Sequence, residues 1–200
     1  WLEYYGVKRI IFSLGFLSEQ IISYLDSIKS KSTEFKIVVE NYPMGTAGAI
    51  RNARSQINTD PILVINGDSF VDADLCNFVN FHFSQNNKAS ILCTSVKDAS
   101  RYGSVKVSPN RKVISFNEKA KISRPGYISA GVYLFNRSTI DDISNSGASL
   151  EKDYLSNQDK ETIGVMAGDF KFLDIGTPET LSNAPLVLNH FLNKFRILGS

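Results

Sequence analysis

The stretch Glu40–Ala49, with the sequence ENYPMGTAGA, is the one around which the rest of the chain is organised. It follows an apolar, strand-like run over residues 35–39 and leads into a helix-like run over residues 49–57. Two glycines and small neighbours at a strand-to-helix junction leave backbone N–H groups uncovered, so that a ligand can approach closely. The stretch therefore predicts a ligand-binding loop at the end of a strand.

Two acidic residues follow other strand-like runs in the same way. Asp68 comes after the apolar run 62–66 and Gly67, and Asp174 closes the run 170–173. A lone Asn-Gly-Asp is as often a turn or a helix cap as a site. Magnesium, however, is usually held by one or two carboxylates together with substrate phosphates. The two acids together therefore indicate a Mg²⁺ site and a nucleotide.

Length and composition favour one α/β domain over residues 1–200, because 42% of the residues are apolar and can fill a core. The formal net charge is +2, and no cluster of Lys and Arg stands out, so nucleic acid and anionic membrane are not expected partners. No apolar run approaches the roughly 18 residues of a membrane span. A cytoplasmic protein is expected.

The cysteines and histidines do not indicate a reactive centre. Cys76 and Cys93 lie in apolar surroundings without metal-ligand spacing, which predicts buried free thiols in a reducing compartment. His82 shares a helical stripe with apolar residues and is expected to be half-buried packing, and His190 has no visible partner. Neither histidine is assigned a catalytic role.

The first half of the chain alternates strands and helices. Strands are expected at residues 7–14, 35–40, 62–66 and 89–96, and helices at residues 19–28, 49–57 and 74–85, the last capped by Asp74. Alternation with short connections predicts a Rossmann-like, doubly wound, mostly parallel sheet. In such sheets the ligands bind beyond the carboxyl ends of the strands.

The second half is expected to be mixed. Tyr127–Phe135 is long, apolar and aromatic, as a buried central strand would be. Thr177 is expected to cap a last helix that begins at Pro178 and is kinked at Pro185. The other elements expected here are a hairpin of strands 102–108 and 112–118, short helices 138–143 and 150–155, and strands 162–167 and 170–174.

Several further positions have two possible readings. Lys119 could neutralise a phosphate and Glu118 could accept sugar hydroxyls, but solvated rim charges explain the pair as well. Gly103, Ala130 and Gly131 lack bulk where a sugar ring could lie, but a bend or tight packing explains small residues in a strand equally well. Both readings stay open for each position.

Taken together, these features resemble the family of sugar 1-phosphate nucleotidyltransferases, from about residue 1 to the last helix. Each matching string is short, but the strings occur in the family's order. They are PMGTAGA (43–49), NGD (66–68), RYG (101–103), FNEK (116–119), SAGVY (129–133) and LDIGTPE (173–179). The resemblance implies a Rossmann-like fold of the nucleotide-diphospho-sugar transferase type and an enzyme that joins a nucleoside monophosphate to a sugar 1-phosphate with Mg²⁺.

The resemblance also implies roles for single residues. The metal ligands would be Asp68 and Asp174, with Asp68 and Lys119 at the centre of catalysis. The nucleotide would be bound by Glu40, Pro43, Gly45, Thr46, Gly48 and Gly67. The sugar phosphate would be bound by Gly103, Glu118, Lys119, Ala130 and Gly131. The alternatives are a non-catalytic sugar-nucleotide-binding domain and a metal-dependent glycosyltransferase.

Glu40 favours GTP as the nucleotide. Thymidylyl and uridylyl members of the family tend to carry an amide here, whereas a carboxylate only accepts hydrogen bonds and suits the two adjacent donors of guanine. The strings are most similar to those of heptose 1-phosphate guanylyltransferases, with mannose 1-phosphate next. A strand-end surface acid is the alternative reading of Glu40.

One departure from the family concerns the start of the chain. The family's Gly-Gly-x-Gly-Thr-Arg loop and Pro-Lys-Pro segment are not found in this sequence. The expectation is therefore a domain truncated at its N-terminus, or a member that has lost its phosphate loop. A homo-oligomer is possible, because Phe191 and Phe195 could serve an interface.

Overall fold

The computed structural model describes residues 1–28, 30, 32–117 and 122–197, and it has a mixed α/β architecture. The backbone contacts divide the chain into two compact units. The first contains residues 1–60 and 137–157, and the second contains residues 61–136 and 158–200. Each unit is described by itself below, and the expectation of a single domain stays a prediction.

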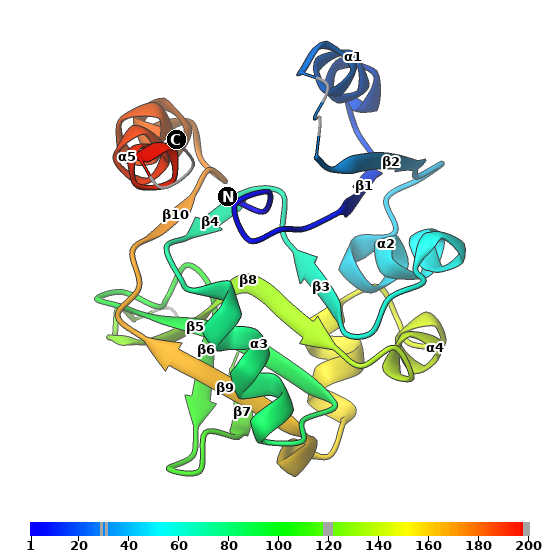
Figure 1. Ribbon diagram of the computed structural model, residues 1–200. Helices are drawn as coiled ribbons and strands as arrows, with labels where there is room; N and C mark the ends of the chain where they lie inside the picture. The colour runs from blue at the N-terminus through cyan, green and yellow to red at the C-terminus, as the bar shows by residue number, and fades with distance from the viewer. Residues whose placement is uncertain (29, 31, 118–121, 198–200) are drawn as a thin grey trace. The chain divides into compact units, whose positions relative to one another are not determined.

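The first unit is built on a pair of parallel strands, β1 and β2, in a register from Arg9 opposite Glu34 to Leu14 opposite Val39. Phe12 and Phe35 meet edge to face across this pair, with ring centroids 5.3 Å apart. The other elements are helical (Figure 1). In chain order the unit contains β1 (Arg9–Leu14), α1 (Ser18–Ile28), β2 (Glu34–Val39), α2 (Gly45–Ala53), η1 (Arg54–Gln56), α4 (Thr139–Ser144), η2 (Leu150–Tyr154) and η3 (Leu155–Asn157).

The second unit holds a four-stranded sheet in the order β3-β8-β5-β9. Strand β8 runs antiparallel to both β3 and β5, whereas β9 runs parallel to β5. Helix α3 lies against β5 and β9, as Figure 1 shows. The strands are β3 (Ile62–Ile65), β4 (Ser69–Val71), β5 (Ala89–Val96), β6 (Ser104–Val107), β7 (Val113–Asn117), β8 (Gly126–Phe135), β9 (Ile163–Gly168) and β10 (Phe172–Asp174). The helices are α3 (Leu75–Ser84), η4 (Lys160–Thr162) and α5 (Pro178–Ile197).

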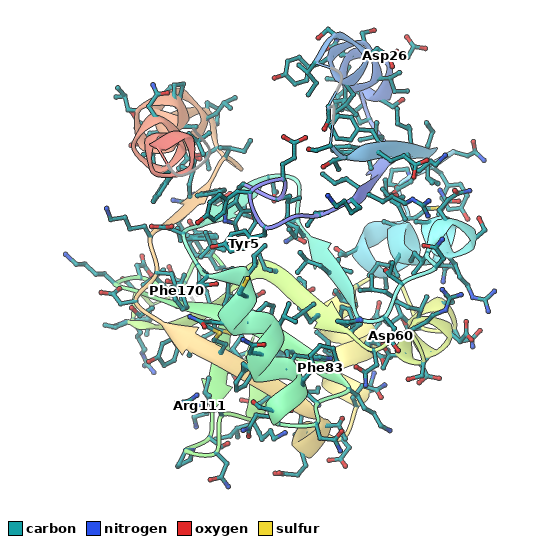
Figure 2. The ribbon with its side chains drawn as sticks, viewed as in Figure 1. Tyr5, Asp26, Asp60, Phe83, Arg111 and Phe170 are labelled. Carbon is teal, nitrogen blue, oxygen red and sulfur yellow. The ribbon has the colours of Figure 1, made fainter. Side chains whose placement is uncertain are left out.

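Most of the expected elements are present. Strand β8 is central and apolar, as predicted, with Ile128, Tyr133 and Phe135 fully buried. Hairpin β6–β7 forms where it was expected. Arg111, labelled in Figure 2, lies in the turn between its two strands. Asp74 caps α3, because its Oδ1 accepts from the N–H groups of Cys76 (2.8 Å) and Asn77 (3.2 Å). The pattern of residue types therefore places these elements correctly.

Three expectations about single residues or boundaries are wrong. Cys93 is buried, and burial raises the pKa of its thiol, but Cys76 is exposed on α3. Phe191 is 2% exposed and packs on Phe70 within its own unit, so it is not available to an interface. Helix α2 begins at Gly45 rather than Ala49. The side chain of Phe195 lies outside the described part of the structure.

His82 is more deeply buried than expected, at 1% exposure, and belongs to a chain of polar side chains in the second unit. Its Nε2 lies 2.8 Å from Asn136 Oδ1, which assigns the proton to Nε2, so that Nδ1 accepts from the Ser90 hydroxyl at 2.9 Å. Asn87 donates to Ser90 Oγ, and Lys112 donates to Asn87. These bonds join α3, β5, the end of β8 and the hairpin.

We expect His82→Phe to lower the free energy of unfolding by about 2–4 kcal/mol, because it leaves the buried hydroxyl of Ser90 and the partly buried amide of Asn136 without the imidazole. Urea denaturation followed by circular dichroism measures the change. Asn80→Ala, on the exposed face of the same helix, is the matched control and should stay within about 0.5 kcal/mol. Equal effects of the two substitutions would contradict a stabilising role for the buried network.

In the described part of the chain, no helix combines the length and the apolar character that crossing a membrane requires.

Candidate active site

The two acids predicted to bind metal lie at the same end of a short strand pair in the second unit. Strands β4 and β10 pair antiparallel, and Asp174 stands opposite Ser69, the residue after Asp68. Just past this last pair of residues, the N–H of Ile175 donates to the backbone carbonyl of Asp68 at 2.9 Å. The structure therefore brings the backbones at Asp68 and Asp174 together although the two residues are far apart in sequence.

Both carboxylates are partly held by neighbouring donors. Asp68 is exposed, and its Oδ1 accepts from the Ser69 hydroxyl at 3.1 Å. The side chain of Asp174 is 17% exposed, and its Oδ1 accepts from the N–H of Gly176 at 2.7 Å. These bonds orient the carboxylates while leaving each of them a second oxygen that can take part in binding.

Two carboxylates would suit a divalent ion that takes its remaining ligands from substrate phosphates and water. Among the described residues there is no group of three or more His, Cys, Asp or Glu side chains that could hold a metal. A closed, all-protein cage is therefore not formed by this part of the chain, whereas two carboxylates are the usual protein contribution to a magnesium–nucleotide site. Asp68 and Asp174 would hold the ion.

The turn that contains Gly103 lies beside Asp174. Gly103 has a left-handed backbone with φ of 80°, and its N–H donates to the carbonyl of Ala99 at 3.2 Å. Burial and the nearby Asp174 carboxylate raise the pKa of Tyr102, just before Gly103. Arg101 Nη2 lies 3.9 Å from Asp174 Oδ2. The sequence indicated this turn through its glycine but gave no sign that its aromatic and basic side chains meet Asp174.

Gly67, Ala130 and Gly131 surround the end of strand β3. Gly131 has a φ of 71° in a bulge of β8, and a Cβ there would lie 2.9–3.0 Å from the Asn66 side chain. Ala130 is 1% exposed. Gly67 is exposed, and a Cβ there would meet nothing within 4 Å. Tight packing thus explains Gly131, while Gly67 leaves open space next to Asp68. Glu118 and Lys119 lie outside the described residues.

The base-binding residues predicted from the sequence lie in the first unit, between β2 and α2. Glu40 Oε2 accepts from the N–H of Met44 at 3.2 Å, and Oε1 accepts from the Ser13 hydroxyl at 3.4 Å. The carboxylate is therefore held inside the turn formed by residues 40–44. Pro43 is exposed, as is Asn41, so the outer side of this turn is accessible.

The glycines of this stretch form the first turn of helix α2 rather than a long open loop. Gly45 has a φ of 70°, and a Cβ there would lie 2.5 Å from the carbonyl oxygen of Ala148. That oxygen accepts from the N–H of Ala47 at 2.9 Å. Gly48 is buried, and a Cβ there would meet Met44 at 2.6 Å. The backbone is thus less uncovered than predicted, and Thr46 remains partly exposed at the helix start.

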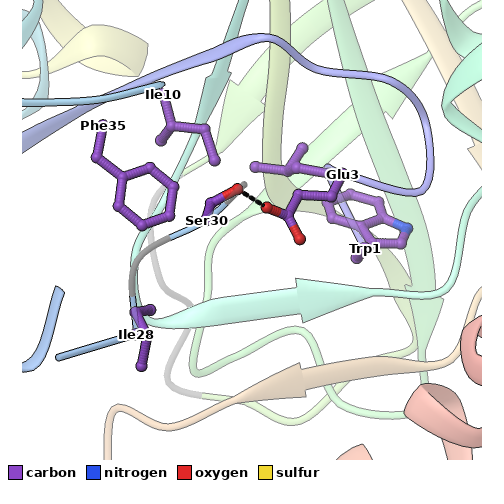
Figure 3. A pocket seen from close by; sticks show the side chains of 7 residues that line it. Trp1, Glu3, Ile10, Ile28, Ser30 and Phe35 are labelled. Carbon is purple, nitrogen blue, oxygen red and sulfur yellow. Dashed lines mark hydrogen bonds between the residues drawn. The ribbon is translucent and has the colours of Figure 1, made fainter. Parts of the chain in front are cut away.

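The first unit also contains a pocket of about 510 Å³ that none of the predicted site residues lines. Figure 3 shows Ile10, Ile28 and Phe35 on one side and Trp1 and Glu3 on the other, with Glu3 accepting from the Ser30 hydroxyl. Its lining is mostly apolar, and it lacks paired charges that would bind phosphate. It has no visible link to the predicted chemistry.

The mixed sheet, the acid pair and the glycine-rich helix start are those of a Rossmann-like α/β protein of the nucleotide-diphospho-sugar transferase type. The chain belongs to the nucleotidyl transferase family, whose model matches residues 3–189. The predictions of this family, of its fold and of an enzyme of this class are therefore confirmed.

Named relatives and solved structures agree with this assignment. The chain is 30% identical over 195 residues to D-glycero-alpha-D-manno-heptose 1-phosphate guanylyltransferase of Aneurinibacillus thermoaerophilus, covering 96% of this chain and 83% of that one. It is 28% identical to the mannose-1-phosphate guanylyltransferase catalytic subunit beta of Dictyostelium discoideum, covering 94% of this chain and 54% of the relative. The chain thus spans most of the heptose relative and about half of the mannose relative.

The solved structures include HddC from Yersinia pseudotuberculosis, with a TM-score of 0.80 and 32% identity over 92% of this chain and 80% of that one. The same protein was also solved in complex with GMP-PN, with a TM-score of 0.79 and 31% identity over 92% of this chain and 81% of that one. These matches confirm the predicted α/β fold. The roles of individual site residues remain predictions.

Proposed function

We propose that this protein transfers GMP from GTP to a sugar 1-phosphate of the heptose or mannose type, releasing pyrophosphate and forming a GDP-sugar. The observation that carries the proposal is the β4–β10 pairing, because it places Asp68 and Asp174 at one strand end. The names of the guanylyltransferase relatives supply the base and the sugar class. Glu40, held in its turn by Met44 and Ser13, is consistent with that base.

The reaction needs positioning and charge neutralisation more than proton transfer. A phosphate oxygen of the sugar 1-phosphate forms a bond to the α-phosphorus of GTP, and the bond from that phosphorus to the bridging oxygen of pyrophosphate breaks. The attacking oxygen is already ionised, so no general base is required. We propose Mg²⁺ as the divalent ion, which supplies charge neutralisation when held by Asp68 and Asp174. Lys119 is proposed to neutralise the sugar phosphate.

The sugar and its phosphate are proposed to lie beside the turn of Gly103 and the residues Glu118 and Gly131. Residues that shape this side are small or conformationally special, as Gly103 and Gly131 are with positive φ. The nucleotide is proposed to contact Pro43, Thr46 and the start of α2. A reducing compartment that holds GTP, such as the cytoplasm, suits this chemistry.

Glu40 is proposed to select guanine. Its two oxygens accept from Ser13 and Met44, so the carboxylate has a fixed direction, and each oxygen has a second lone pair for another donor. Guanine offers two adjacent donors, N1–H and the 2-amino group, whereas uracil and thymine offer one donor between two acceptors. An amide at this position would suit the pyrimidines better.

Pyrophosphate release by the full-length protein, measured with each of GTP, UTP, dTTP and CTP together with mannose or heptose 1-phosphate and Mg²⁺, tests the proposal. We expect GTP to give the largest kcat/KM. Glu40→Gln should reduce the preference for GTP over UTP by about 10-fold, the range expected for one lost charge-assisted hydrogen bond. Glu19→Gln, an exposed acid of α1 in the same unit, is the matched control and should not change it.

A wild-type preference for UTP or dTTP would overturn the choice of guanine but not the transfer reaction. Binding of GTP without pyrophosphate release would favour a sugar-nucleotide-binding domain without turnover.

A further inference from the structure

We propose that Arg101 binds the phosphate of the sugar 1-phosphate, and that Tyr102 is a positioning residue that holds Asp174 and Arg101 in place for it. The inference rests on the proposed function, because it assumes that Asp68 and Asp174 hold the metal. It assigns a task to two side chains of the 101–103 turn that the reaction described above does not use.

Tyr102 packs against one face of strand β10. Its ring meets Phe172 edge to face, with centroids 5.8 Å apart and planes at 79°. Asp174 lies two residues further along β10 and therefore on the same face of the strand as Phe172, so that its carboxylate lies near the Tyr102 hydroxyl. One side chain thus lies against both Phe172 and the predicted metal ligand.

Arg101 is held more loosely at the same carboxylate. Its guanidinium carbon lies 5.5 Å from the centroid of the Tyr102 ring, and its Nη2 lies 3.9 Å from Asp174 Oδ2. The side chain is 49% exposed, whereas that of Asp174 is 17% exposed. A long contact of this kind between a half-exposed cation and a carboxylate contributes little to stability. Its placement is therefore better explained by a ligand than by folding.

A phosphate is the ligand that this geometry fits. A guanidinium presents a planar set of donors that matches phosphate and carboxylate oxygens in pairs, and the tyrosine face supports it from one side. A metal ion between Asp68 and Asp174 would compete with Arg101 for the Asp174 carboxylate and repel it. The guanidinium would then turn to the phosphate that arrives with the metal.

The sugar 1-phosphate is favoured over the triphosphate because Arg101 belongs to the same turn as Gly103, and the proposed function has the sugar and its phosphate beside this turn. That turn is fixed to the start of β8, since the N–H of Ala99 donates to the carbonyl of Arg124 at 2.9 Å. Gly126 also packs there, because a Cβ at its position would lie 3.5 Å from that of Ala99. Kinetics with each substrate varied in turn separates the two sources of phosphate.

The first test measures Mn²⁺ binding by electron paramagnetic resonance of the free ion, without any substrate. Tyr102→Phe should weaken Mn²⁺ binding about 10-fold, as loss of a partner that orients a metal ligand does. Arg101→Gln should instead tighten it about 2-fold to 5-fold, because a competing cation is removed. Lys106→Gln, which removes a positive charge from an exposed position of β6, should leave it unchanged. Weaker binding in Arg101→Gln would overturn the proposal.

The second test adds inorganic phosphate or mannose 1-phosphate to the Mn²⁺ titration and measures KM for both substrates. In the wild type either phosphate should tighten Mn²⁺ binding, and in Arg101→Gln this gain should disappear. Arg101→Gln should raise KM for the sugar 1-phosphate about 10-fold or more, with KM for GTP changed by less than about 2-fold. Arg101→Lys should restore only part of the loss.

The outcomes separate this inference from the proposed function. Product formation with normal Mn²⁺ binding, and with Arg101→Gln equal to Lys106→Gln, would overturn the role of Arg101 alone. A larger effect of Arg101→Gln on the KM for GTP than on the KM for the sugar phosphate would overturn the assignment to the sugar. Absence of Mn²⁺ binding in the wild type would overturn the metal site and this inference together.

Discussion

Asp68→Asn is expected to lower kcat by about 1,000-fold or more, because it removes a negative ligand from the ion that neutralises the reacting phosphates. The free energy of unfolding should change by less than about 1 kcal/mol, since Asp68 is exposed and its carboxylate accepts from the neighbouring Ser69 hydroxyl. Initial rates of pyrophosphate release at saturating substrates, together with urea denaturation, measure both quantities.

Asp74→Asn is the matched control for this prediction. Asp74 is another exposed aspartate of the same segment, and it caps α3 through two backbone N–H groups. Because asparagine is about as good an N-cap as aspartate, this change should alter neither the rate nor the stability appreciably. Substantial residual activity in Asp68→Asn would remove Asp68 from the metal site.

Gly45→Ala is expected to lower the free energy of unfolding by about 2–5 kcal/mol. The φ of 70° costs any residue with a Cβ about 1–2 kcal/mol. The added methyl group would in addition lie 2.5 Å from the carbonyl oxygen of Ala148, a backbone atom that cannot move aside without disturbing its bond to Ala47. Thermal and urea unfolding measure the loss.

Gly67→Ala is the comparison for that change. Gly67 does not have a left-handed backbone, and a Cβ there would meet nothing within 4 Å. Its substitution should leave stability within about 0.5 kcal/mol. Equal losses at the two positions would show that the close approach of Ala148 to α2 is not a constraint on the first unit.

The fold could be predicted from the sequence because most elements carry a clear pattern. Strands β5 and β8 are long apolar runs, and Asp74 before α3 and Thr177 with Pro178 before α5 mark helix starts by their chemistry. The start of α2 was placed four residues too late, because glycines are poor helix formers and the contact with Ala148 that fixes this turn lies far away in sequence.

The acid pair shows which part of the candidate site could be predicted from the sequence and which could not. Asp68 and Asp174 were found from their positions after strand-like runs, but strand β4, which brings them together, was missed. Its length of 3 residues is too short for a period to be recognised. The prediction that Cys76 is buried is wrong for a related reason, because an apolar neighbourhood in sequence does not say which face of a helix a residue occupies. The sequence likewise does not show that Tyr102 and Asp174, from distant segments, lie close together.

The pairing of β4 with β10 is a separate ribbon that is not part of the hydrogen-bonded four-stranded sheet. A ribbon this short is not stable alone. Helix α5 follows directly after β10, and its Phe191 packs on Phe70 of β4 with ring centroids 5.1 Å apart. The C-terminal helix therefore packs on both strands of the ribbon that carries the two aspartates, and part of that packing is an aromatic contact outside the proposed reaction centre.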